Sequence, residues 1–187
     1  MNILFITPYT PSPIRVRALY FLKSLTERGH HVTLLFLSEK EIPSSKLTNL
    51  NSLESYGFEL PKWKSLFNCL QALPTNLPLQ SVYSWNDQLA NKIHSILSNQ
   101  KIDIVHVEHL RGVKYALKIK KNFNVPIVWD SVDSISLLFR QTQNNHPRKY
   151  LRWLIKFELQ RTEKFEKFLA TQFEKFWLPL KKIKMNF

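Results

Sequence analysis

The sequence predicts an α/β fold, in which a mostly parallel, Rossmann-like sheet has helices on both faces and is followed by a long C-terminal helix. First, short apolar runs without polar alternation recur along the chain, which is typical of parallel strands buried on both faces. Second, amphipathic helical segments separate these runs, as in strand–helix–strand units. Third, 187 residues with a hydrophobic fraction of 44% suit one domain with a substantial core and exclude a disordered chain.

The first part of the chain predicts a parallel strand–helix–strand unit. Asn2 to Thr7 is a short apolar run, and the prolines of the segment TPYTPSP prevent a helix directly after it. A helical apolar stripe follows from Val16 to Leu25, and Gly29 marks its C-terminal end. His31 to Leu37 is a second apolar, β-branched run. Two strands joined by a crossover helix are the unit from which parallel sheets are built.

The middle of the chain predicts further helices and strands after a stretch with weaker signals. Residues 38–85 contain loop-forming serines and a short helical segment, Leu66 to Leu73, that prolines terminate. Asn86 is a suitable N-cap for the amphipathic helix that follows it. Three elements are expected next, namely a strand at 102–107, a helix at about 110–121 and a strand at 125–129.

The C-terminal part differs from the rest in charge and aromatic content. A helix start is expected at Asn145 to Pro147, and helix-forming sequence without a breaker runs from Arg148 to about Trp177. Residues 147–187 hold eleven Lys and Arg, four Glu and nine aromatic residues, so more than half of the net charge of +13 lies there. We therefore expect a Rossmann-like domain at 1–146 and a basic, aromatic helix and tail at 147–187.

Composition and motif spacing exclude several classes of protein. The three glycines stand too far apart for a dinucleotide-binding fingerprint or a Walker loop. The single cysteine, Cys69, excludes an internal disulfide and a cysteine-based zinc cluster. His106, Glu108 and His109 lack the helical spacing of a metal site, and no G-x-S-x-G nucleophile elbow occurs. This spacing leads us to expect that the protein binds no metal. Because no signal peptide or membrane-spanning stretch is evident, we expect a cytoplasmic protein.

Candidate site residues follow the predicted strands, because ligands of open parallel sheets bind beyond the carboxyl ends of the strands. Arginines open the first helix, a Glu-His-Arg set follows the strand at 102–107, and two aspartates follow the strand at 125–129. The candidates are Arg15, Arg17, Glu108, His109, Arg111, Asp130 and Asp133. Guanidinium groups and helix N-termini at such a rim suit phosphate or carboxylate groups of a ligand.

Each candidate also has a structural interpretation. The two arginines can be solvated residues of a helix start, and Glu108 can simply pair with Arg111. The two aspartates, or Ser134, can cap a helix that begins at Ile135. A histidine inside the strand at 102–107 is favoured as a satisfied core residue over a ligand, whereas His109 is evenly balanced between a site role and a structural one.

Four segments, taken in order, resemble the N-terminal half of GT-B glycosyltransferases of the family 4 type. The opening NILFITPYTPSPIRVRALYFLKSLTERGHHVTLLFL is similar to that group's first strand, loop, helix ending in glycine and second strand. The segments LPLQSVYSW, DIVHVEHLRG and VPIVWDSVDSISLLFRQT are similar to a subgroup of bacterial sugar transferases, as found in polysaccharide biosynthesis. The resemblance spans roughly residues 1 to 170 and rests on the order and spacing of these segments.

This resemblance implies an enzyme of two Rossmann-like domains, of which the chain supplies the acceptor-binding one. In such enzymes the C-terminal domain binds a nucleotide sugar, and a hexose passes to a lipid-linked or saccharide acceptor, usually without a metal. The resemblance implies that Arg15 and Arg17 line the acceptor side of the cleft, with the other candidates nearby. It assigns no catalytic residue.

The chain departs from the family pattern at three places. PSPIRVR stands where many relatives have a glycine-rich turn, which puts backbone binding of a phosphate there in doubt. Val132-Asp133 stands where many have a His-Asp pair, which puts a catalytic histidine there in doubt. The nucleotide-sugar domain is absent, so we expect a truncated enzyme that binds no cofactor itself and is inactive alone, and whose partner is a separate chain carrying that domain.

The basic C-terminal helix suggests an alternative of another class. A helix rich in Lys, Arg, Trp and Phe is typical of binding to an anionic membrane surface, so a non-catalytic protein at the inner face of the membrane is the alternative function. Nucleic-acid binding is disfavoured, because no nucleic-acid-binding motif accompanies the charge.

Overall fold

Six strands form one sheet in the computed structural model, which describes residues 1–12, 16–38, 52–145, 149–173 and 175–177. The strands are β1 (Asn2–Thr7), β2 (His31–Ser38), β3 (Leu53–Glu59), β4 (Ile104–Glu108), β5 (Ile127–Asp130) and β6 (Lys175–Trp177). Their order across the sheet is β3-β2-β1-β4-β5-β6, and every neighbouring pair is parallel. The predicted α/β class with a parallel, Rossmann-like sheet is thereby confirmed.

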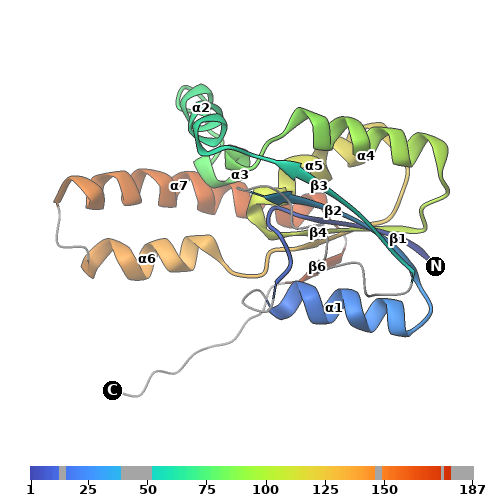
Figure 1. Cartoon of the computed structure of the whole chain (residues 1–187). Coiled ribbons are helices and arrows are strands. Elements are labelled where there is room, and N and C mark those ends of the chain that lie inside the picture. The colour runs from blue at the N-terminus through green and yellow to red at the C-terminus, as the bar shows by residue number, and fades with distance from the viewer. Residues whose placement is uncertain (13–15, 39–51, 146–148, 174, 178–187) are drawn as a thin grey trace, which may run out of the picture.

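Helices lie on both faces of this sheet. They are α1 (Val16–Glu27), α2 (Lys62–Ala72), α3 (Leu79–Tyr83), α4 (Asp87–Asn99), α5 (His109–Asn122), α6 (Ile135–Asn145) and α7 (Lys149–Gln172). Figure 1 shows α1 below the sheet and α4 and α5 above it, while α6 and α7 run side by side away from the sheet. Crossover helices on opposite faces are what a parallel sheet with this strand order requires.

Strand β1 divides the core into two parts because its side chains alternate between the faces of the sheet. Ile3 and Phe5 pack with Leu22 of α1 in the smaller apolar cluster. Leu4 and Ile6 belong to the larger cluster, which includes the buried residues of α4 and α5. A strand buried on both faces explains why the run has no polar alternation.

Two helix ends form as the sequence predicts. Gly29 follows α1 with φ of +77°, and the backbone N–H groups of Gly29 and His30 donate to carbonyls of the last turn of α1. Glycine adopts this left-handed conformation without the steric penalty of a Cβ atom. At the start of α4, the Asn86 side chain accepts hydrogen bonds from two backbone N–H groups of the first turn.

The C-terminal region corrects the prediction of a helix that continues to about Trp177. Helix α7 ends at Gln172, and Lys175–Trp177 forms β6, which pairs with β5. Leu169 and Phe173 are buried in the larger core cluster, so the chain returns to the sheet, where the edge of β5 offers unpaired backbone groups. The expected helix start falls partly on residues 146–148, which lie outside the described residues.

Among the described residues between 38 and 85, the weak signals conceal one strand, the short helix α3 and a longer helix than expected. Strand β3 pairs with β2 at the edge of the sheet, and its residues are exposed or half-buried. A half-exposed edge strand lacks the continuous apolar run that marks the inner strands, so the sequence does not reveal it. The helix expected from Leu66 begins earlier, at Lys62, directly after Pro61.

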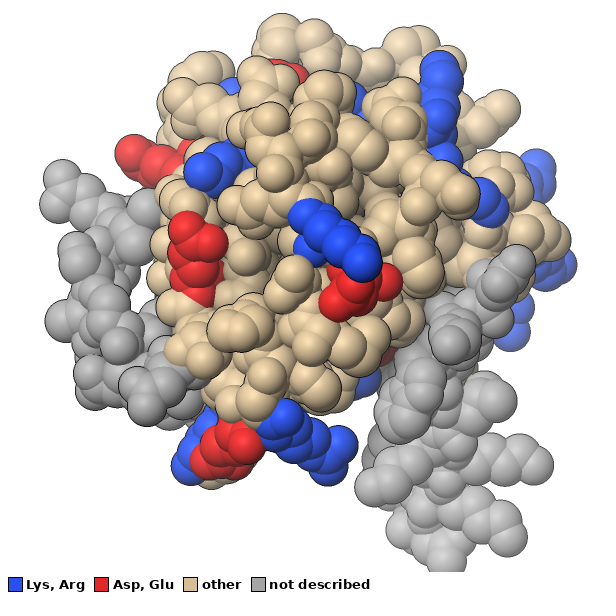
Figure 2. All heavy atoms as spheres, turned by 90° about the vertical axis from the view of Figure 1, so that its right-hand side faces the viewer, with Lys and Arg blue, Asp and Glu red and all other residues tan. Residues whose placement is uncertain are grey.

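Charge on the described surface is mixed on the side that carries the N-terminus. Figure 2 views this side and shows basic and acidic side chains in small groups among uncharged residues. In α1, for example, Lys23 lies 3.7 Å from Glu27. Among the helices that the structure describes, none is both long enough and apolar enough to cross a bilayer.

Candidate functional site

The carboxyl ends of β1, β4 and β5 meet at one edge of the sheet, where the strand order reverses direction. From β1 the chain proceeds to β2 on one side, whereas β4 and β5 lie on the other side of β1. Loops that diverge at such a switch point leave a crevice, which is where open parallel sheets bind ligands. The residues predicted from the strand ends therefore lie at the topologically expected place.

An ionic cluster occupies this edge on the α1 side of the sheet. Glu108 and Asp130 are the last residues of β4 and β5 and are register partners across the two strands. Arg17, in the first turn of α1, forms an ion pair with the Asp130 carboxylate. The Asp130 side chain is buried, whereas the Arg17 side chain is partly exposed. The structure thus brings together three of the predicted site residues from three elements.

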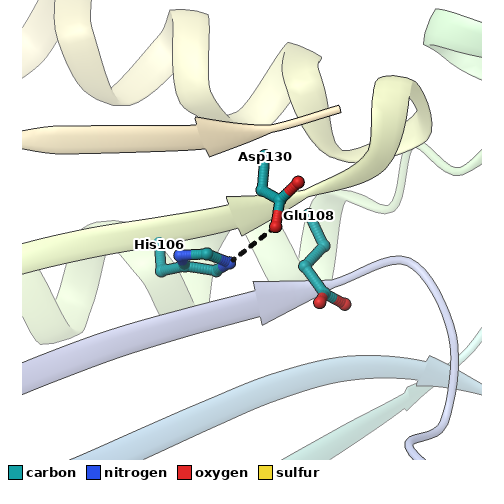
Figure 3. Close-up of side chains that lie close together, drawn as sticks. All are labelled: His106, Glu108 and Asp130. Atoms are coloured by element: carbon teal, nitrogen blue, oxygen red, sulfur yellow. Dashed lines mark ion pairs between the residues drawn. The ribbon is translucent and has the colours of Figure 1, made fainter. Parts of the chain in front are cut away.

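His106 belongs to the same cluster, because it lies two residues before Glu108 on β4 and points to the same face. Its ring stacks on Phe5 with a centroid distance of 4.5 Å, which agrees with the predicted core position. Its Nε2 atom is buried without a hydrogen-bond partner and lies 4.0 Å from Oδ2 of Asp130 (Figure 3). Burial lowers the pKa of His106 to about 4 and outweighs the opposing effect of Asp130, so the ring is neutral near pH 7.

Glu108 has the opposite tendency, since burial raises the pKa of its carboxyl group. The hydroxyl of Tyr9 donates a hydrogen bond of 2.8 Å to Oε2 of Glu108 and partly offsets this effect. The nearby Asp130 carboxylate raises the Glu108 pKa further. The site therefore combines a neutral imidazole with a carboxyl group that resists ionisation.

Three side chains of the cluster could hold a metal ion. Donor atoms of His106, Glu108 and Asp130 all lie within 4.8 Å of one another. The sequence analysis predicts no metal site because His106, Glu108 and His109 lack helical spacing; the third residue of the observed set, Asp130, comes from the neighbouring strand. Arg17 pairs with Asp130, so one of the two carboxyl groups of the cluster is already compensated by a cation of the chain.

The backbone is strained just beyond the ends of β4 and β5. His109 has φ of +66° and Val132 has φ of +62°, a conformation that costs a residue with a Cβ atom roughly 1–2 kcal/mol. Such strain concentrates at functional sites. Nδ1 of His109 accepts a hydrogen bond of 3.1 Å from the backbone N–H of Arg111, so this ring contributes to the start of α5.

A cavity of about 350 Å³ opens beside the cluster at the carboxyl ends of β1 and β2. Hydroxyl, aromatic and cationic groups line much of it, among them Tyr9, Thr10, Ser38, Ser65, Tyr83 and Arg111. The Arg111 guanidinium lies 4.6 Å from the Tyr83 ring centroid, and Nε of Arg111 donates to Oε1 of Gln80 at 2.6 Å. These contacts hold the cation at the cavity wall.

A second cavity, of about 440 Å³, lies between α1 and the sheet. Its walls are mostly apolar, and the Arg17, His106, Glu108 and Asp130 side chains lie at its polar end. The side chain of His106, with its unpartnered Nε2 atom, therefore borders an open cavity.

The remaining candidates lie elsewhere. Asp133 is exposed in the turn after β5, and Arg15 lies outside the described residues. The Ser134 hydroxyl accepts a hydrogen bond from the backbone N–H of Leu137, as the capping interpretation predicts, and Glu166 of α7 accepts two further backbone N–H groups of α6.

Sequence reasoning did not identify Tyr9 and Tyr83 as candidates, and it favoured a core role over a ligand role for His106. Tyr9 lies in a proline-rich loop, and no spacing signal links it to Glu108, 99 residues later. The alternation of β4 was the available signal for His106, because it puts positions 106 and 108 on one face.

The fold defines the chain as an α/β protein with a parallel, Rossmann-like sheet, and this fold is similar to about half of one solved enzyme chain, a sucrose-phosphate synthase. No protein-family model and no curated protein matches the sequence. The likeness is therefore one of structure.

The chain is similar to several solved structures. Sucrose-phosphate synthase from Thermosynechococcus elongatus has a TM-score of 0.57 and 8% identity, over 95% of this chain and 47% of that chain. Apo UGT2 from Phytolacca americana has a TM-score of 0.45 and 14% identity, over 80% and 34% of the two chains. A UDP-glucosyltransferase from Polygonum tinctorium has a TM-score of 0.40 and 14% identity, over 76% and 32%. The chain spans about half the length of the sucrose-phosphate synthase, and the similarity to it establishes the fold alone.

Proposed function

We propose that this chain is the acceptor-binding half of an enzyme that transfers a hexose from a nucleotide sugar to a lipid-linked or saccharide acceptor. The cavity of about 350 Å³ at the carboxyl ends of β1 and β2 carries the proposal. Its size falls within the range of roughly 300–1,000 Å³ that small-molecule sites occupy. Hydroxyl groups suit the polar edges of a sugar, and the aromatic rings suit its apolar faces.

Tyr9 connects this cavity with the ionic cluster. Its side chain lines the cavity, and its hydroxyl donates to Glu108. In our proposal, Glu108 positions the Tyr9 hydroxyl toward an acceptor hydroxyl, while Arg111 binds an anionic or hydroxyl group of the same acceptor. The raised pKa of Glu108 allows this carboxyl to hold or take up a proton closer to neutral pH than an exposed glutamate does.

The donor sugar in this proposal is bound by a second domain. Departure of a nucleoside diphosphate requires preorganised donors for its developing charge. The cluster at the strand ends contains two carboxyl groups and a single described cation, Arg17, which Asp130 already engages. We therefore expect this half to bind acceptor but to transfer no sugar unless a nucleotide-sugar-binding domain, in the same or a separate chain, completes the cleft.

Direct binding tests the proposal without a second domain. The chain is screened against immobilised mono- to tetrasaccharides and against short-chain prenyl-diphosphate-linked sugars, and hits are titrated by calorimetry. Arg111→Ala should weaken binding by at least about tenfold, equivalent to about 1.4 kcal/mol, whereas the control Arg140→Ala, on exposed α6, should leave it unchanged. Absence of any saccharide binding, or equal binding by both variants, would refute the acceptor site.

A transfer assay tests the division of labour. The chain, a bound acceptor and labelled nucleotide sugars are incubated with and without a separately produced nucleotide-sugar-binding domain. Product should form only in the mixture. Product from the chain alone would show that this half binds the donor as well, which contradicts the proposal.

The structure leaves fewer side chains available for the alternative, membrane binding through the C-terminal helix, than the sequence suggests. Phe165, Leu169 and Phe173 of this region are buried in the core, so they serve the fold. The exposed part of α7 includes Trp153 and Leu154. Membrane contact through α7 remains a prediction that the vesicle experiment below also tests.

A further inference from the structure

Helix α2 is amphipathic, but its polar face is buried and its apolar face is exposed. Its buried residues are Ser65, Asn68 and Ala72, and the Asn68 side chain donates a hydrogen bond of 2.9 Å to the carbonyl of Trp85. Its apolar stripe points outward, with exposed fractions from 46% to 70%, and consists of Trp63, Leu66, Phe67, Leu70 and, at the C-cap, Leu73. A helix that packs only for folding buries its apolar stripe.

This outward stripe, called here the α2 stripe, lies at the periphery of the molecule. Figure 1 shows α2 standing above the sheet at the upper edge of the fold. The five side chains are spaced by three or four positions, so they form one continuous surface and not scattered single residues. Contiguous exposed apolar surface of this kind marks a site of interaction with a protein or a membrane.

The charge around the α2 stripe selects between these partners. Lys62 and Lys64 flank Trp63, and the chain has no acidic residue from Leu60 to Trp85. An acidic group from outside this segment, Asp87, lies 4.0 Å from Nζ of Lys64. This composition differs from the mixed charge seen on the side in Figure 2. Lysines beside tryptophan and aliphatic residues, on a segment that has no acidic residue of its own, are typical of helices that lie in the interface of anionic bilayers.

A neighbouring groove holds the same types of aromatic and basic residue, together with Asp87, which accepts a hydrogen bond from the Trp85 indole N–H. Trp63 and Phe67 line one wall of a cavity of about 550 Å³, and Trp85 and Lys114 line the other. The ammonium group of Lys114 lies 4.3 Å from the Trp85 ring centroid. Tryptophan and lysine together favour the headgroup level of a membrane, where the ring meets the acyl boundary and the cation meets phosphate.

We propose that the chain docks on an anionic lipid bilayer through the α2 stripe, with the helix parallel to the membrane plane. The apolar side chains enter the boundary between headgroups and acyl chains, and Lys62, Lys64 and Lys114 contact lipid phosphates. Because α2 has 11 residues, the docking is peripheral and reversible, and it depends on the anionic lipid as well as on the apolar contact.

Docking would also place the acceptor cavity beside the bilayer. Ser65, on the buried face of α2, lines that cavity, while the stripe lies on the opposite face of the same helix. A lipid-linked acceptor would then present its sugar to the cavity while its lipid stays in the membrane. This consequence rests on the proposed function, whereas the membrane docking itself does not.

Co-sedimentation of the full chain with vesicles tests the docking. Vesicles of phosphatidylcholine alone are compared with vesicles that contain about one third phosphatidylglycerol, and only the latter should bind strongly. The chain offers a matched pair of tryptophans, because Trp63 on α2 is 70% exposed and Trp153 on α7 is 69% exposed. Trp63→Ser should weaken binding to anionic vesicles by at least about tenfold, and Trp153→Ser should change it by less than about twofold.

Three outcomes would overturn the proposal. Equal binding to both vesicle types would remove the electrostatic basis, and loss of binding only in Trp153→Ser would place the contact on α7. Protection of the stripe in a dimer, seen as a doubled mass that Trp63→Ser reverses, would assign it to a second copy of the chain.

A charge variant guards against a folding artefact. Lys62→Glu combined with Lys64→Glu leaves the stripe intact and should also abolish the preference for anionic vesicles. Circular dichroism and thermal melting should show unchanged folding in Trp63→Ser and Trp153→Ser, because both positions are exposed. Lys64 is half-buried and pairs with Asp87, so the charge variant is used only if its melting temperature is also unchanged. The vesicles contain no sugar, so loss of docking and loss of acceptor binding are observed separately.

Discussion

Replacement of Arg161 by methionine should strongly destabilise the fold, because this buried arginine joins α7 to the segment between α2 and α3. The side chain is 7% exposed, and its Nη1 atom lies 3.1 Å from Oε1 of Glu158. Its Nη2 atom donates to the carbonyls of Ala72 and Thr75. Glu158 in turn accepts a hydrogen bond of 2.8 Å from the backbone N–H of Leu79.

The expected loss follows from the charge that is left behind. Methionine fills a similar volume, so the main change is an uncompensated Glu158 carboxylate and two carbonyls without their donor. Breaking a buried pair by removing one partner costs about 3–5 kcal/mol. At about 2–4 °C per kcal/mol for a chain of this size, the melting temperature should fall by roughly 6–20 °C.

A double-mutant cycle with denaturant unfolding measures this effect. Arg161→Met is combined with Glu158→Gln, which keeps an acceptor for Leu79 but removes the charge. The combination should recover at least about 1 kcal/mol relative to Arg161→Met alone. The control is Arg140→Met, since Arg140 pairs with Glu163 at the exposed surface and should matter by less than about 1 kcal/mol. Equal small losses in Arg161→Met and Arg140→Met, or strict additivity in the cycle, would refute the reasoning.

Three further changes have defined outcomes. The pKa of His106 is lowered to about 4, so the contribution of the neutral ring to stability is complete above about pH 6.5 and is lost as the pH falls from there toward 4. His106→Phe should remove up to about 3 kcal/mol of this acid-dependent loss of unfolding free energy. An unchanged dependence of stability on pH would contradict this expectation. The pKa of Glu108 is raised, so the contribution of the protonated carboxyl to stability is present below about pH 4.3 and declines as the pH rises through the pKa of the folded protein. Glu108→Gln should therefore stabilise the protein at pH 8 but not at pH 4. Equal changes in unfolding free energy at both pH values would count against a buried carboxyl. A Cβ atom on Gly112 would lie 2.8 Å from Cγ1 of Val107, so Gly112→Ala should lower the unfolding free energy by about 1–3 kcal/mol. Val107→Ala should be less destabilising in the Gly112→Ala background than alone. Simple addition of the two losses would argue against this contact.

Much of the fold was predictable because its signals are local. Continuous apolar runs marked the inner strands, Gly29 marked the end of α1, and Asn86 marked the start of α4. Strand β3 and the end of α7 were not predictable in this way. The first is a half-exposed edge strand, and the second is set by packing of Leu169 against the sheet and by pairing with β5.

For the candidate site, the order of strands decided how much could be foreseen. The strand-end rule identified Arg17, Glu108 and Asp130, and these converge because β1, β4 and β5 are neighbours with parallel directions. The contact of Tyr9 with Glu108 depends on a loop that no local pattern places there.

By itself, the sequence determined the α/β class, the inner strands and the edge of the sheet that carries the candidate site residues, because periodicity and strand-end chemistry depend on near neighbours along the chain. Only the tertiary structure decided that the Nε2 atom of His106 faces Asp130, and that α2 buries Ser65 while its apolar stripe faces outward. Periodicity shows that a helix has two faces, but the face that is buried depends on which other elements pack against it.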